Sequence, residues 1–205
     1  MKNLLITAFI LAAGVVSALG QTAADLERQF GSMETIDKQS GFSELDSKRP
    51  IGVYPASPDV WLAPRFAPNG RICQVLLFSR SAEDPALPFE KFAVIIDRLS
   101  PFDTRGPAKE TNFGATATGG GSYWTTFDFE KVRISYSGTS GTFQTGAALK
   151  RGEYKFSEEY ANTTGDAVAA PKPFKPTAEE ISLEFKGRKY QGAAMIWTDR
   201  NCAGN

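Results

Sequence analysis

The sequence predicts a single α+β domain: a mainly antiparallel sheet built from hairpins, one principal helix packed on a face, and one disulfide. Three observations lead to this prediction. Short apolar runs are separated by turn residues, as in antiparallel hairpins. Residues 88–99 have the apolar period of an amphipathic helix. The chain contains only two cysteines, Cys73 and Cys202. No repeat and no shift of composition divides the rest, so we expect one domain over residues 21–205.

The first 20 residues, MKNLLITAFILAAGVVSALG, have the pattern of a secretory signal peptide. Lys2 gives a positive start, Leu4–Val16 is apolar, and small residues occupy the positions that determine cleavage. The apolar run is about 13 residues long, short of the roughly 20 that span a bilayer. We therefore expect cleavage after Gly20 and a secreted or periplasmic protein without a membrane span.

Charge and composition exclude several classes of partner. The chain has 23 basic and 23 acidic residues and no basic block, so it offers no electrostatic surface for nucleic acid. A hydrophobic content of 41% excludes general disorder. In an oxidising compartment the two cysteines, Cys73 and Cys202, are expected to form a disulfide. The alternative, a reactive thiol, would need a base to generate the thiolate.

The chain contains no histidine. This absence removes Ser-His-Asp and Cys-His catalysis, histidine-ligated zinc and histidine acid–base chemistry. No acidic run has the spacing of a calcium loop. We therefore expect no metal and no cofactor.

The first element expected after the signal peptide is a short helix over Thr22–Phe30, because a threonine can cap its start and Gly31 follows its end. Residues 32–58 are polar and broken by glycine and proline. They predict a loop with one short strand near Ile51–Tyr54.

The next element is a hairpin with arms Asp59–Ala67 and Arg71–Ser79, joined by Pro68-Asn69-Gly70. Pro64 interrupts the first arm and favours an outer strand or a bulge there. The second arm is apolar on both faces, which is typical of a central strand covered on two sides.

The principal helix is predicted over Pro88–Leu99, and Ser100-Pro101 ends it. We expect this helix to fold back and cover one face of the hairpin. Its apolar side chains lie within one arc at the helical period. They are Phe89, Phe92, Ile95, Ile96 and Leu99.

Later elements are predicted from shorter patterns. Residues 102–122 read as a long turn-rich connection, followed by strands at Tyr123–Phe129 and Lys131–Tyr136. Residues 137–177 are polar and form either a tolerated insertion or a mobile flap.

The last expected element is a second hairpin. Alternating apolar residues predict strands at Glu180–Phe185 and Lys189–Thr198, with a turn at Gly187-Arg188. Cys202 lies just beyond it, so the disulfide would tie this hairpin to the first.

The motifs that bear on chemistry are weak. Gly119–Gly121 lacks the following helix of a phosphate-binding loop, and a flexible connector is favoured. Asn162 begins an N-glycosylation sequon, which matters only in a eukaryotic secretory route. The carboxylates that remain as catalytic candidates are scattered: Asp97, Asp128, Glu130, Glu158-Glu159 and Glu179-Glu180. The aromatic residues that could stack on sugar rings are Trp61, Tyr123, Trp124 and Trp197.

Two functions follow from these observations. The preferred prediction is a non-enzymatic exported module that binds a protein, a peptide or a small apolar ligand, with the loops 102–122 and 137–177 as the expected contact surface. The alternative is a histidine-free hydrolase that acts on carbohydrate through two carboxylates. No catalytic, cofactor or metal residue is assigned.

Overall fold

The computed structural model describes residues 21–36, 51–81, 83–116, 122–139 and 177–202. The signal peptide, Gly119–Gly121, the sequon at Asn162 and most of the polar segment 137–177 lie outside the described residues.

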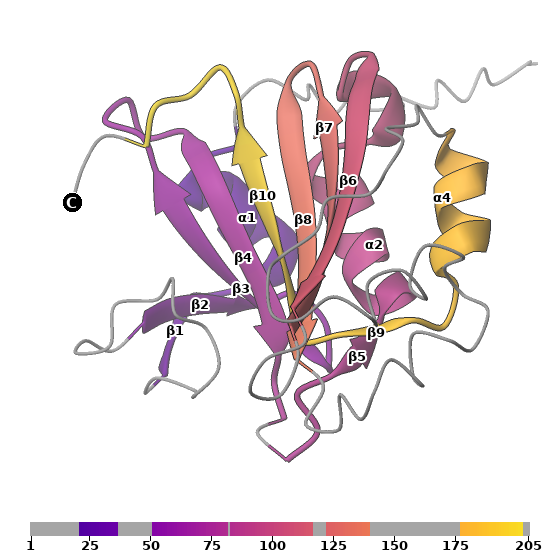
Figure 1. The fold of residues 1–205 in the computed structure, drawn as a ribbon. Coiled ribbons are helices and arrows are strands. Elements are labelled where there is room, and N and C mark those ends of the chain that lie inside the picture. The colour runs from indigo at the N-terminus through magenta and orange to yellow at the C-terminus, as the bar shows by residue number, and fades with distance from the viewer. Residues whose placement is uncertain (1–20, 37–50, 82, 117–121, 140–176, 203–205) are drawn as a thin grey trace, which may run out of the picture.

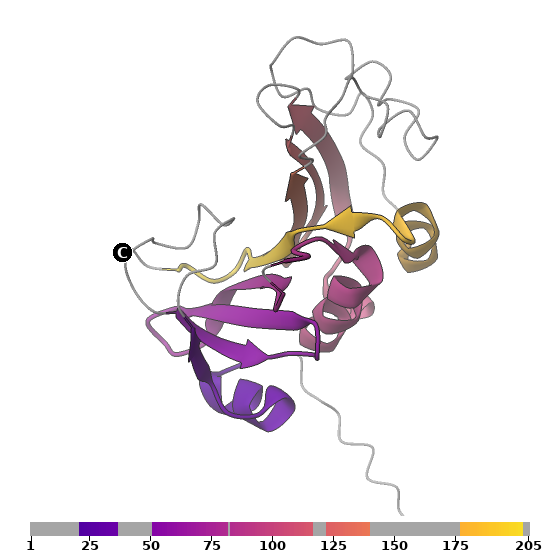
Figure 2. The same cartoon turned by 90° about the horizontal axis from the view of Figure 1, so that it is seen from below.

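An eight-stranded antiparallel sheet is the frame of the molecule (Figure 1). The strand order is β1-β2-β3-β4-β10-β8-β7-β6, so β10 joins a first half, β1 to β4, to a second half, β6 to β8. Figure 2 shows β3 and β4 running across the direction of β6 to β8, with α2 in the angle between the halves. The strands are β1 (Glu34–Ile36), β2 (Ile51–Pro55), β3 (Val60–Phe66), β4 (Ile72–Ser79), β6 (Ala108–Thr116), β7 (Ser122–Phe129), β8 (Val132–Thr139) and β10 (Gly192–Trp197). A separate pair is formed by β5 (Leu87–Pro88) and β9 (Lys189–Tyr190).

The predicted first hairpin is confirmed as β3 and β4. Gly70 has a φ of +77° in its turn, a left-handed backbone conformation that glycine adopts without strain. All eight residues of β4 are buried, as expected for a central strand. The register shifts between Arg65 and Phe66, one residue beyond Pro64, and Pro64 itself lies past the part of β3 that pairs with β2. The proline therefore costs the sheet no hydrogen bond on that side.

Three helices pack into one hydrophobic core with the sheet. They are α1 (Ala23–Phe30), α2 (Phe89–Leu99) and α4 (Ala178–Phe185), and a 3₁₀ turn, η1 (Phe102–Thr104), follows α2. The five apolar residues predicted for the principal helix are the buried residues of α2. In α1, Thr22 and Asp25 form a capping box, and Gly31 follows the last turn.

Two predicted elements are wrong. Residues 102–122 were expected as a connection, but they contain β6, a nine-residue edge strand paired with β7. Glu180–Phe185 was expected as a strand, yet it lies in helix α4. Ile181 and Phe185 are four residues apart, so in a helix both face the core, where both are buried. The second hairpin is therefore absent from the described chain, and only its return strand, β10, is confirmed.

The predicted disulfide is confirmed. Cys73 in β4 is bonded to Cys202, which follows β10, and their Cα atoms are 5.4 Å apart. Because β4 and β10 are neighbours in the sheet, the bond closes one end of this central pair.

The opposite face of the sheet differs between its halves. Under the first half, a smaller apolar cluster of Val53, Trp61, Ala63, Leu76 and Phe78 is buried. On the second half this face carries polar pairs: Arg133 Nε donates to Asp128 at 2.5 Å, and the hydroxyls of Thr126 and Ser135 are 3.0 Å apart. No helix in the described part of the chain is long and apolar enough to cross a membrane.

Candidate functional site

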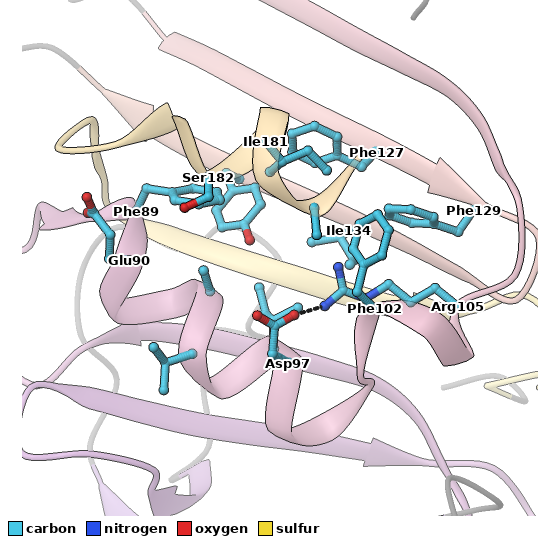
Figure 3. A pocket seen from close by; sticks show the side chains of 15 residues that line it. Phe89, Glu90, Asp97, Phe102, Arg105, Phe127, Phe129, Ile134, Ile181 and Ser182 are labelled. Carbon is cyan, nitrogen blue, oxygen red and sulfur yellow. Dashed lines mark hydrogen bonds and ion pairs between the residues drawn. The ribbon is translucent and has the colours of Figure 1, made fainter. Parts of the chain in front are cut away.

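A cavity of about 200 Å³ lies between α2, α4 and the strands β7 and β8 (Figure 3). Most of its lining is apolar and aromatic, as in small-molecule binding sites. The residues that define its walls are Phe89, Phe102, Phe127, Phe129, Ile134 and Ile181.

Each wall follows from a local sequence pattern. On α2, Phe89, Ala93 and Ile96 recur at helical spacing and face the sheet. On β7, Phe127 and Phe129 are two residues apart, so both point to the same face of the sheet. The space therefore lies where the short helix α4 covers the aromatic side chains of α2 and β7.

Three charged side chains line this mainly apolar space, Glu90, Asp97 and Arg105, and of these Arg105 is the buried one. Arg105, which follows η1, is only 5% exposed. Its Nε donates to the Ser100 carbonyl at 2.9 Å, and its Nη2 forms an ion pair with the Asp97 carboxylate. The guanidinium also lies 5.2 and 5.5 Å from the ring centroids of Phe102 and Phe129. These contacts fix the guanidinium firmly at the cavity wall.

Burial perturbs the titration of two groups of the wall, Arg105 and Tyr136. Removal from water lowers the pKa of Arg105, and the nearby Asp97 carboxylate opposes this effect. Burial raises the pKa of Tyr136, which also lines the cavity, well above its ordinary value, and the positive charge of Arg105 partly offsets the rise. At neutral pH the wall therefore holds a cationic guanidinium and a neutral phenol.

The candidate carboxylates do not form a catalytic pair. Among those whose side chains are described, only Asp97 lines the cavity, and it is engaged with Arg105. Asp128 is paired with Arg133, and Glu130 and Glu179 are exposed. Glu158, Glu159 and the side chain of Glu180 lie outside the described residues. Glu90, which was not a candidate, also lines the cavity and accepts a hydrogen bond from the Gly187 amide at 2.7 Å.

The candidate sugar-stacking aromatics lie apart from the cavity lining. Arg80 covers the ring of buried Trp61, 3.9 Å from its centroid, and Arg200 lies 4.9 Å from the centroid of Trp197. Trp124 is half-buried on β7, and the side chain of Tyr123 is not among the described ones. The tryptophan rings covered by arginines are not open platforms for a sugar.

Of the two loops expected as the contact surface, 102–122 and 137–177, only the first can be compared with the structure. Much of the first stretch is strand β6, and most of the second lies outside the described residues. Phe102 and Arg105, at the start of the first stretch, do line the cavity. Cys73 and Cys202 are not among its lining residues. Within the described chain, no group of three or more Cys, Asp or Glu is placed to hold a metal ion.

Sequence reasoning missed Arg105 and Ile181 as site residues. For Ile181 a signal existed: Thr177 precedes the segment and Gly187 follows it, as at the start and end of a helix. The Ile181 amide donates to the Thr177 carbonyl, and Gly187 has a φ of +74°. For Arg105, a single arginine in a polar stretch, no local pattern indicates burial.

No protein-family model, curated protein or solved structure matches this chain.

Proposed function

We propose that this protein is an exported, non-enzymatic binding module that holds a small, mainly apolar ligand in the cavity between α2, α4, β7 and β8. The observation that supports this proposal is the cavity itself: about 200 Å³ of space with an aromatic lining. The space opens to solvent beside exposed Val94 and Ser182, so a ligand can reach its aromatic lining from the surface.

The volume limits the ligand. An engineered apolar cavity of about 150 Å³ takes up benzene. A cavity of about 200 Å³ is thus suited to one ring with a short substituent. The ring pairs already present, such as Phe127 with Phe185 at 5.3 Å and Phe89 with Phe185 at 5.6 Å, show the tilted and edge-on contacts that a ligand ring could extend.

An entry route is available beside α2. Val94 lines the cavity and is 62% exposed, an unusual state for a valine next to a core. Across the cavity, α4 is only eight residues long and is held to the core by Ile181 and Phe185. A helix this short is marginal by itself, so small displacements of α4 can admit a ligand.

The disulfide supports the exported part of the proposal. Disulfides persist in oxidising compartments and are rare in reduced cytosol. The bond between Cys73 and Cys202 fits a protein that folds after transport.

Ligand-observed NMR with a panel of neutral one-ring compounds tests the proposal on the protein from residue 21 onward. We expect several compounds to bind the parent protein. The variant Ala93→Phe places a ring in the cavity and should weaken their binding at least tenfold. The matched control Lys91→Met lies on the same helix but outside the cavity lining, and it should leave binding unchanged. No binding by any compound, or equal binding by both variants, would refute the proposal.

A further inference from the structure

We propose that the ligand of this cavity carries a carboxylate, which pairs with Arg105 while the apolar remainder occupies the space between α2, α4 and the sheet. This inference depends on the proposed function, because it names the chemical class of the same ligand: a small aromatic or aliphatic carboxylic acid.

The first argument is the position of the cation. Arg105 is almost completely buried, yet it belongs to the lining of a mainly apolar space. Its hydrogen bonds within the described chain leave from Nε and Nη2. Figure 3 shows the other terminal nitrogen of the guanidinium pointing into the cavity. A guanidinium presents its donors as a fork that matches the two oxygens of a carboxylate.

The second argument is the imbalance of the ion pair. The side chain of Arg105 is 6% exposed, but that of its partner Asp97 is 59% exposed. The compensating negative charge is thus largely in water, where its field is screened, while the positive charge is buried. The Ser100 carbonyl and the rings of Phe102 and Phe129 supply only partial negative charge. A ligand anion inside the cavity would add a second negative charge close to the buried guanidinium of Arg105.

The third argument concerns the remaining polar groups of the lining. Glu90 accepts the Gly187 amide, so this carboxylate is already engaged elsewhere. The phenol of Tyr136 is neutral and is a potential hydrogen-bond donor to an anion. The lining therefore offers one cation, Arg105, with the Asp97 carboxylate beside it, the Glu90 carboxylate near the start of α2, and mainly apolar walls between them.

A matched pair of ligands separates this inference from the proposed function. Binding of 3-phenylpropionate and of 3-phenylpropanamide, which share the ring and the chain length, is measured by titration calorimetry. A charge-assisted hydrogen bond predicts that the acid binds about tenfold or more tightly than the amide.

Asp97 provides the variant, because replacing the buried Arg105 would disturb the fold. In Asp97→Asn the intramolecular competitor for the guanidinium loses its charge. We expect the affinity for the acid to rise about threefold to tenfold and the affinity for the amide to stay within twofold. The control Asp103→Asn removes the same charge two residues before Arg105, at an exposed position, and should change neither affinity by more than twofold.

The outcomes are distinct. Equal binding of acid and amide, or no selective gain in Asp97→Asn, would overturn the carboxylate inference and leave the apolar site standing. The same gain in Asp103→Asn would show a general charge effect and would also overturn it. If neither compound binds and the neutral panel also fails, the proposed function falls with it.

Discussion

The docking of α4 on the core can be tested by the change Phe185→Ala. Phe185 is completely buried, and its ring contacts those of Phe127 and Phe89. Arg188 also lies over this ring, 4.6 Å from its centroid. The residue thus fixes the last turn of α4 to the sheet and to α2 at once.

The expected loss of stability follows from these contacts. Removing a fully buried phenylalanine side chain forfeits up to about 3 kcal/mol of transfer free energy. Each ring contact adds about 0.5–1.5 kcal/mol. We therefore expect the free energy of unfolding to fall by about 3–5 kcal/mol, the range typical of Phe→Ala in a core. The loss of stability is smaller if α4 detaches from the core before the rest of the protein unfolds, because the mutation can then cost no more than the free energy with which α4 docks.

Urea unfolding followed by tryptophan fluorescence measures this loss, and amide hydrogen exchange of α4 tells global unfolding from local detachment. The control Ser182→Ala changes an exposed position of the same helix and should alter stability by less than about 0.5 kcal/mol. The reasoning is refuted if Phe185→Ala costs less than about 1 kcal/mol and the exchange of α4 amides stays as in the parent protein.

Two further predictions concern the disulfide and the first helix. Replacing Cys73 and Cys202 together by alanine should lower the free energy of unfolding by roughly 4–5 kcal/mol, because the bond closes a long loop. The parent protein, unfolded without reductant, should show no titratable thiol. The detection of two thiols would contradict the pairing. Thr22→Ala should cost about 1 kcal/mol in thermal or urea unfolding. The hydrogen bond from the Thr22 amide lowers the pKa of Asp25 below 3.8 in the folded state. The stability that the Asp25 carboxylate contributes to folding is therefore present above about pH 4 and is lost as the pH falls through its folded-state pKa. Asp25→Asn should abolish the part of the acid dependence of unfolding that comes from this carboxylate.

The elements with complete local patterns were predicted correctly. The hairpin β3-β4 has a turn signal between two apolar runs, and α2 has five apolar residues on one arc before a proline stop. Strands β7 (Ser122–Phe129) and β8 (Val132–Thr139) agree closely with the strands predicted over residues 123–129 and 131–136. The cysteine pair was predicted from compartment and number alone, and the neighbouring positions of β4 and β10 explain its geometry.

The two wrong elements share a physical cause. In the segment of α4, Ile181, Leu183 and Phe185 satisfy the period of a strand, while Ile181 and Phe185 also satisfy that of a helix. Tertiary packing decides between the two: in the helix Phe185 contacts the rings of Phe127 and Phe89, and Ile181 is buried in the same core. Strand β6 carries glycine and asparagine, which weaken strand propensity. Its pairing with β7 supplies the backbone hydrogen bonds that define it.

The candidate site depended on these same segments. The wall formed by α2 could be anticipated, since its apolar face was predicted residue by residue. The opposing wall comes from a helix expected as a strand. The cation comes from Arg105, whose burial results from the turn η1 and from rings distant in sequence. A cavity between elements is a property of their three-dimensional arrangement, so local periodicity cannot reveal it.

The place of β10 in the sheet determines when the molecule can fold. Among the described strands, this one comes last in the chain, yet it lies between β4 and β8 and links the two halves of the eight-stranded sheet. During synthesis, β1 to β4 and β6 to β8 can each form hairpins, but they stay unjoined until residues 192–197 have emerged. Such long-range pairing is slow to form and exposes apolar edges meanwhile. The two halves can therefore join only after residues 192–197 take their place between β4 and β8.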